Sequence, residues 1–261
     1  MSDPGVYVRT LLALLLLTQS VTTRPCPFDG TWVIDSAATQ PPNNPTVLLL
    51  ADGMFGHTGE QIKADGTDRK VPGTGYSDTM SVRIIDDRTV EIILKKAGRP
   101  MFTETDTVSA DGQTLTQVVK DTTEAETVTI ETVSKRLKKG PNGSHALSGS
   151  WQAYKVNRSK NGSIITYRCT LDGFSARTPL GEGFDAKFDG NFYPVEDDAA
   201  HTMVMLKLLN PDTVEQASKR DGKIVGILRL TVAQDGKTIQ ATYENKEDKT
   251  ITRSKMVKQK E

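Results

Sequence analysis

The feature of this sequence that most constrains its fold is an internal repeat at a constant spacing. Because one offset shared by separate blocks is hard to produce by chance, we infer that one unit has been duplicated. The repeat predicts two homologous domains at 28–137 and 147–261, joined by a linker of turn-forming composition at 138–146. Three blocks recur 124 residues later, namely 82–86 at 206–210, 89–91 at 213–215, and 107–115 at 231–239.

Each unit has the composition of a β domain. Short runs rich in Val, Ile, Thr and Tyr alternate with turn residues, and no segment keeps a helical period for three turns. Asp-Gly favours the tight hairpin turn, in which both central residues need positive φ. The sequence therefore predicts an all-β protein of two tandem antiparallel barrels, which leave few exposed sheet edges. Eight Asp-Gly pairs begin at Asp29, Asp52, Asp65, Asp111, Asp172, Asp189, Asp221 and Asp235.

The first 25 residues have the pattern of a secretory signal peptide. Arg9 is followed by an apolar run at 11–17, which is shorter than the roughly 20 residues needed to span a bilayer. We expect cleavage near residue 25, a secreted or periplasmic location and no membrane insertion afterwards. The alternative is a short buried helix.

Export would change the meaning of the two cysteines, Cys26 and Cys169. An oxidising compartment permits a disulfide between them. Two separate thiols fit the sequence equally well, because the distance that a bridge requires cannot be read from it. Both alternatives stay open.

Charge is balanced overall and unbalanced between the repeats. The chain has 33 basic and 33 acidic residues, so we expect no nucleic-acid partner. Residues 28–137 hold 11 basic and 17 acidic residues, whereas 147–261 hold 18 and 15. Opposite signs favour intramolecular docking of the two repeats, although a screened surface would give the same counts.

Two resemblances concern the family. Gly30-x-Trp32 and Gly149-x-Trp151, each opening a β-rich unit, resemble the start of lipocalin-like (calycin-type) barrels. That resemblance implies an up-and-down barrel with a cavity for a small, mostly apolar molecule. The segments 186–190, 193–195 and 231–238 resemble a group of uncharacterised exported bacterial β proteins, which implies no activity. The sequence departs from lipocalins proper in its duplication and in lacking a carboxy-terminal helix pattern.

The repeat also suggests which side chains face inward. In repeat 2, Leu228 and Leu230 share one face of a strand, and Arg229 makes the opposite face the exterior. The same register in repeat 1 places Glu104 and Asp106 inside the first barrel. Buried acids would have raised pKa values or bind a cationic or sugar-like ligand, and their spacing suits a glycosidase-type pair. Alternatively, the neighbouring threonines are buried and both acids are solvated.

Other candidate ligand contacts are aromatic or polar residues in apolar surroundings. The apolar stripe Ile92 and Leu94 of repeat 1 is replaced by Gln216 and Ser218 in repeat 2, so the two interiors differ chemically. Aromatic residues near a barrel opening can hold an apolar or sugar ligand, although packing in the core explains each of them as well. The predicted ligand-binding residues are Phe102, Tyr167, Phe184, Tyr193, Gln216 and Ser218.

Function follows from the architecture more than from motifs. The sequence has no Gly-x-Ser-x-Gly, Ser-x-x-Lys or His-Glu-x-x-His motif, and we expect no cofactor and no metal. The first hypothesis is an exported binding protein that holds a small apolar or amphipathic molecule in a barrel cavity. The alternative is a secreted hydrolase of glycosides or esters that uses Glu104 and Asp106 as catalytic residues. A third possibility is a structural module whose barrels are filled solid.

Overall fold

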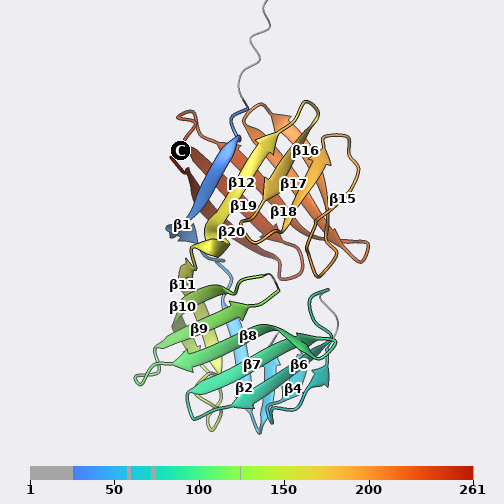
Figure 1. Cartoon of the computed structure of the whole chain (residues 1–261). Coiled ribbons are helices and arrows are strands. Elements are labelled where there is room, and N and C mark those ends of the chain that lie inside the picture. Colours follow the sequence, from blue (N-terminus) through green and yellow to red (C-terminus); the bar gives the residue numbers. More distant parts are fainter. Residues whose placement is uncertain (1–25, 58–59, 72–74, 124, 261) are drawn as a thin grey trace, which may run out of the picture.

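The computed structural model describes residues 26–57, 60–71, 75–123 and 125–260, and the expected signal peptide lies outside them. These residues form two antiparallel sheets of ten strands, one above the other in Figure 1. The all-β prediction and the prediction of tandem barrels are confirmed. No helix among the described residues is long and apolar enough to cross a membrane.

The sheet of the first barrel contains, in chain order, β2 (Thr46–Ala51), β3 (Met54–His57), β4 (Glu60–Lys63), β5 (Arg69–Lys70), β6 (Thr79–Ile84), β7 (Thr89–Lys96), β8 (Arg99–Val108), β9 (Thr114–Asp121), β10 (Val128–Lys139) and β11 (Gly149–Arg158). The sheet of the second barrel contains β1 (Gly30–Gln40), β12 (Ile164–Cys169), β13 (Gly173–Arg177), β14 (Gly183–Lys187), β15 (Tyr193–Pro194), β16 (Met203–Asn210), β17 (Thr213–Arg220), β18 (Lys223–Val232), β19 (Thr238–Asn245) and β20 (Thr250–Lys258). Each sheet curls until its edges approach, with bridges Asp65–Arg83 and Gly183–Glu196.

Turn chemistry explains much of the strand order. Five of the eight Asp-Gly pairs lie between strands that pair with each other, as predicted. At Asp52-Gly53 and Asp221-Gly222 both residues have positive φ, which is the geometry of the two-residue hairpin. Ala97-Gly98, at the position equivalent to 221–222, makes the same turn without an aspartate.

The two sequence repeats exchange their first strands. β1 pairs with β12 and β20, so it completes the second barrel, whereas β11 pairs with β2 and β10 in the first. In Figure 1 the blue β1 stands beside the yellow β12 and the red β20, above the other strands of its own repeat. The repeat boundaries therefore describe units of sequence, and each barrel is assembled from both units.

The connection after β1 favours this exchange. Residues 41–45, which join β1 to β2, are Pro-Pro-Asn-Asn-Pro. Each proline fixes its own φ and holds the preceding residue in an extended conformation. A segment of this kind resists the tight turn that would pair β1 with β2, so the chain continues into the other barrel.

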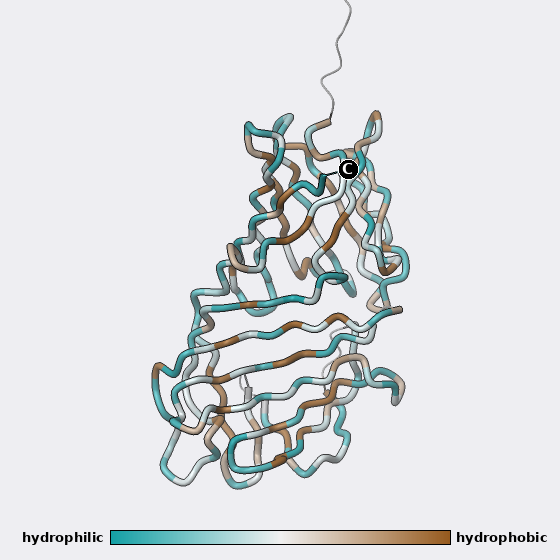
Figure 2. Tube along the Cα trace, turned by 60° about the vertical axis from the view of Figure 1, so that its left-hand side comes forward, coloured by the Kyte–Doolittle hydropathy of each residue, from teal (hydrophilic) through white to brown (hydrophobic). Residues whose placement is uncertain are grey.

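Each barrel has a separate hydrophobic core around one tryptophan. Trp32 and Trp151 are both fully buried, and each donates its indole N–H to the carbonyl oxygen four residues earlier, on Phe28 (2.7 Å) and Leu147 (2.9 Å). Figure 2 shows hydrophobic and hydrophilic residues alternating along many strands, as inward and outward faces require. The tryptophans close the barrels from strands that belong to the opposite repeat.

The two cysteines form a disulfide. Cys26 precedes β1 and Cys169 ends β12, and their Cα atoms lie 6.1 Å apart. Because β1 and β12 are neighbours in the second barrel, the bridge ties the exchanged strand to the barrel that it completes. Of the two alternatives left open by the sequence, the structure has the bridged one.

Two equivalent loops meet where the barrels join. One contains Gly75 and precedes β6, and the other contains Ala200 and precedes β16. Gly75 packs against Ala200, where an added Cβ would come within 2.9 Å of the Ala200 Cβ. Lys96 donates to the carbonyl oxygens of Gly75 (2.5 Å) and Ala199 (2.6 Å), so one ammonium group links both loops. The guanidinium group of Arg220, at the position equivalent to Lys96, lies over the Tyr76 ring. These contacts hold the first barrel against the opening of the second.

Candidate functional site

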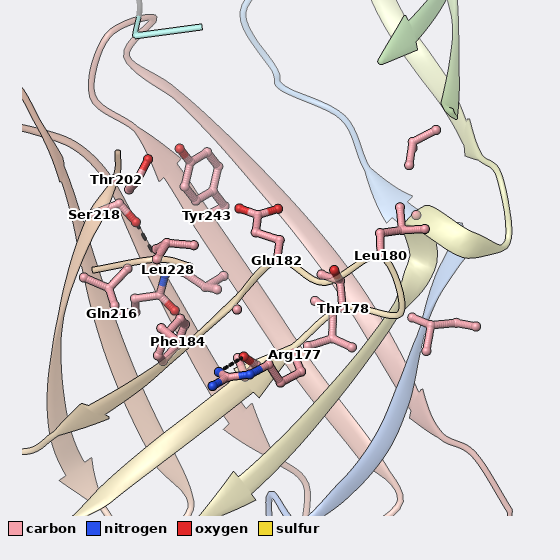
Figure 3. Close-up of a pocket in the computed structure, with 18 of the residues that line it drawn as sticks. Arg177, Thr178, Leu180, Glu182, Phe184, Thr202, Gln216, Ser218, Leu228 and Tyr243 are labelled. Carbon is pink, nitrogen blue, oxygen red and sulfur yellow. Dashed lines mark hydrogen bonds between the residues drawn. The ribbon is translucent and has the colours of Figure 1, made fainter. Parts of the chain in front are cut away.

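The second barrel contains a cavity of about 390 Å³ that reaches the junction with the first barrel. Its walls come from strands on all sides of the barrel, including the exchanged strand β1 through Ile34. Figure 3 shows Phe184, Gln216, Ser218, Leu228 and Tyr243 around this space. The inner wall is mostly apolar and includes Ile34, Ile165, Tyr167, Ala176, Phe184, Val204 and Leu228.

One polar pair interrupts this apolar wall. Gln216 and Ser218 are successive inward residues of β17, and the Gln216 amide donates to the Ser218 hydroxyl at 3.4 Å. Both side chains are half-buried and neutral. The pair offers hydrogen-bond donors and acceptors without a charge, so it suits the polar end of an otherwise apolar molecule.

Tyr243 reaches the cavity because the neighbouring strand leaves room for its ring. A Cβ at Gly226 of β18 would lie 2.4 Å from the Tyr243 hydroxyl oxygen, so a side chain there would displace the ring. In the first barrel the equivalent positions hold Phe102 and Val119, with the larger side chain on the other strand. Burial raises the pKa of the Tyr243 hydroxyl, which therefore stays neutral and able to donate.

The mouth of this cavity is charged and partly covered. The loop 178–182 between β13 and β14 is closed by a hydrogen bond from the Thr178 N–H to the Glu182 carbonyl (2.8 Å), and it brings Leu180 to the opening. Arg177 forms ion pairs with Asp185 (2.5 Å) and Glu196 (3.3 Å). The first barrel contributes lining residues at this end, including Tyr76, Asp121 and Val128.

The structure brings four of the six predicted ligand-binding residues into this one cavity, namely Tyr167, Phe184, Gln216 and Ser218. Tyr193 lies outside it, because its hydroxyl donates to Asp189 (2.7 Å) and its ring packs on the outer part of the core. Phe102 lies at the junction, edge-on to Tyr76 with ring centroids 5.9 Å apart.

The first barrel has a cavity of its own, also of about 390 Å³. Neither barrel is therefore filled solid. Glu104 and Asp106 of β8 both line this cavity, so the register transferred from Leu228 and Leu230 is the one that the structure has, and the alternative with solvated acids is excluded. Apolar side chains form most of the remaining wall, namely Leu48, Phe55, Ile62, Met80, Ile92 and Leu94.

Asp106 is the most unusual ionisable group in this cavity. Its residue is 1% exposed, and neither carboxyl oxygen has a hydrogen-bond partner among the described residues. Burial, together with the neighbouring Glu104 carboxylate, raises the pKa of Asp106 to about 9. Glu104 accepts a hydrogen bond from the Gln117 amide at 2.9 Å. At neutral pH Asp106 therefore keeps its proton.

The two cavities place their polar groups on opposite members of one strand pair. In the first barrel Ile92 of β7 lies opposite Glu104 of β8, whereas in the second Gln216 of β17 lies opposite Leu228 of β18. In the first barrel the apolar residue is on the earlier strand, β7, and the polar one on β8. In the second barrel the polar residue is on the earlier strand, β17, and the apolar one on β18. The difference between the interiors that the sequence predicted is confirmed: at this strand pair the second barrel has uncharged polar groups and the first has two acids.

Several lining residues were missed at the level of sequence. Tyr243 shares a face of β19 with Ile239 and Ala241, so the alternation of inward residues was sufficient to find it. Ile34 and Tyr76 belong to repeat 1, and only the exchange of strands and the packing of the barrels bring them to the second cavity.

The fold and the cavities define a class: a duplicated all-β protein of two barrels, each with a ligand-sized cavity, in which the two sequence repeats exchange their first strands. The chain matches no model of a known protein family and no curated protein. Membership of the lipocalin-like barrels, or of the exported bacterial group, stays a prediction.

Proposed function

We propose that this protein is an exported binding protein that holds one small, mostly apolar molecule in the cavity of the second barrel. The observation that carries the proposal is a ligand-sized space with a mostly apolar inner wall, the uncharged Gln216–Ser218 pair within that wall, and charged residues at its mouth. Such a combination is typical of sites that bury the body of a ligand and orient it through a few polar contacts. The ligand class is therefore an amphipathic molecule with one uncharged polar end.

Export is part of this proposal. The Cys26–Cys169 disulfide supports it, because such bonds persist in oxidising compartments. The apolar run at 11–17 supports it independently. Resemblance to lipocalin-like barrels adds a family context in which a barrel interior serves as a binding site.

A hydrolase remains a second candidate because of Asp106. A carboxyl group that keeps its proton at neutral pH can act as a general acid, and Glu104 beside it is the carboxylate of such a pair. The assay is the release of nitrophenol from nitrophenyl glycosides and esters by the wild type and by Asp106→Asn. Turnover that is absent in the wild type, or equal in the two proteins, removes this candidate.

Filling the second cavity is expected to abolish binding of a neutral apolar probe. In Ser218→Trp the indole ring enters the space beside Gln216, so N-phenyl-1-naphthylamine should bind at least about tenfold more weakly than to the wild type. The measurement is a fluorescence titration, with thermal unfolding monitored by circular dichroism to show that the variant folds.

The repeat supplies the matched control for this experiment. Leu94 is the equivalent of Ser218 in the first barrel, so Leu94→Trp places the same ring in the other cavity. It should leave probe binding within about twofold of the wild type, well inside one tenfold step. Equal loss in both variants, or no binding by the wild type, would contradict the proposal.

A further inference from the structure

We propose that the first barrel is a second and chemically distinct binding site, for an organic ammonium ion whose apolar body fills the barrel and whose charged head contacts Glu104 and Asp106. This site does not depend on the function proposed for the second barrel. The two cavities have different lining residues and can be tested separately.

The first argument is an excess of hydrogen-bond acceptors. A buried carboxyl group without a partner is costly, because it loses its hydration and gains nothing in exchange. Asp106 is in this position, since both its oxygens lack a partner among the described residues. A ligand that donates a hydrogen bond to the Asp106 carbonyl oxygen would reduce the cost.

The second argument is the missing counter-charge. The described residues that line this cavity include no lysine, arginine or histidine, and their only ionisable members are Glu104 and Asp106. The facing strands β2, β3, β4, β6, β7 and β9 contribute Thr46, Leu48, Phe55, Ile62, Met80, Ile92, Leu94 and Gln117. The acidic pair therefore has no cation beside it among the described lining residues. A monovalent ammonium ion would balance it.

Gln117 leaves most of the acceptor positions available. Its amide donates to one oxygen of Glu104 at 2.9 Å, which fixes the orientation of that carboxylate. The other Glu104 oxygen and the carbonyl oxygen of the protonated Asp106 remain as acceptors for a ligand. A primary ammonium group has three N–H donors, which is enough to bond both of these oxygens.

The walls exclude other ligands of acidic sites. A calcium ion needs six to eight oxygen ligands, and a sugar needs polar partners on several sides. Here six apolar side chains surround the acids, and Thr46 and Gln117 are the only other polar residues among the described lining residues. A single polar head on an apolar body fits this distribution. The acids select an ammonium head over an alcohol or a carboxylate.

In the second barrel, apolar residues occupy the positions that are equivalent to the two acids. Glu104 and Asp106 correspond to Leu228 and Leu230, which lie on the inner side of β18. The double variant Glu104→Leu/Asp106→Leu therefore replaces the acids with the residues that the protein itself uses in the equivalent strand. Apolar residues of similar volume commonly replace buried ionic groups without loss of stability.

The test is isothermal titration calorimetry at pH 7 with hexylammonium, 1-hexanol and hexanoate. In Ser218→Trp, whose second barrel is filled and cannot take hexanol, we expect hexylammonium to bind at least about tenfold more tightly than either of the others, the effect of one charge-assisted hydrogen bond. Glu104→Leu/Asp106→Leu should lose this preference, and Leu94→Trp should lose binding altogether. Ser218→Trp, which fills the other barrel, should bind hexylammonium as the wild type does.

Two controls keep the result interpretable. Binding of N-phenyl-1-naphthylamine to the double variant shows that its second barrel is intact, and the single variant Glu104→Gln removes the charge with the smallest change in shape. Equal affinity for hexylammonium and hexanol, or an unchanged preference in the double variant and in Glu104→Gln, would overturn the proposal.

Discussion

Asp106→Asn is expected to stabilise the folded protein by about 2–4 kcal/mol at pH 7 and by almost nothing at pH 4. In the folded protein the pKa of Asp106 is raised to about 9 from the ordinary 3.8, so the group keeps its proton at neutral pH. The unfolded chain loses that proton above pH 4. Between the two pKa values, rising pH therefore favours the unfolded wild type, whereas asparagine stays neutral in both states.

The measurement is urea unfolding of both proteins at several pH values from 4 to 8.5. The stabilities should diverge as pH rises, by up to about 1.4 kcal/mol per pH unit. Asp87→Asn is the control, because the Asp87 side chain is 89% exposed and its replacement should give no such divergence. Parallel curves for the wild type and Asp106→Asn would show that Asp106 is ionised in the folded protein.

The second large effect is expected at the two tryptophans. Trp151→Ala and Trp32→Ala should each lower the free energy of unfolding by about 3–5 kcal/mol, because each removes a fully buried ring and its hydrogen bond. In Trp151→Ala the Arg136 guanidinium, 3.9 Å from the ring centroid, also loses its aromatic contact.

The exchange of strands is tested by which barrel each substitution destabilises. Trp151 lies in the sequence of repeat 2 and packs in the first barrel, so Trp151→Ala should speed amide hydrogen exchange in β2 to β10. Trp32→Ala should do the same in β12 to β20. Faster exchange of each variant in its own repeat would mean that the first strands are not exchanged.

The parts of the fold that could be predicted are those that depend on local sequence patterns. Alternation and Asp-Gly turns gave the strands, and duplication allowed the register of Leu228 and Leu230 to place Glu104 and Asp106 inside the barrel. The exchange of β1 and β11 could not be predicted in this way. Both strands carry the same Gly-x-Trp start and would fit either barrel, so only the connections and the packing of the whole chain decide.

In the candidate site, too, some residues could be predicted from local sequence and others could not. Gln216 and Ser218 were found because a polar pair replaces an apolar stripe at a fixed offset. Tyr193 does not line this cavity, and its hydroxyl instead forms a hydrogen bond to Asp189 near the barrel opening. Which aromatic residues face the cavity depends on turns such as 188–192, whose path the alternation of strands does not determine.

The central claim is that the second barrel is a ligand cavity, and a bromine-labelled apolar molecule tests it most directly. Crystals of the wild type grown with 1-bromooctane should give an anomalous bromine peak inside the second barrel, among Phe184, Gln216 and Leu228. Crystals of Ser218→Trp should give no peak there. Bromine found only on the protein surface, or at the same interior position in both proteins, would contradict the account.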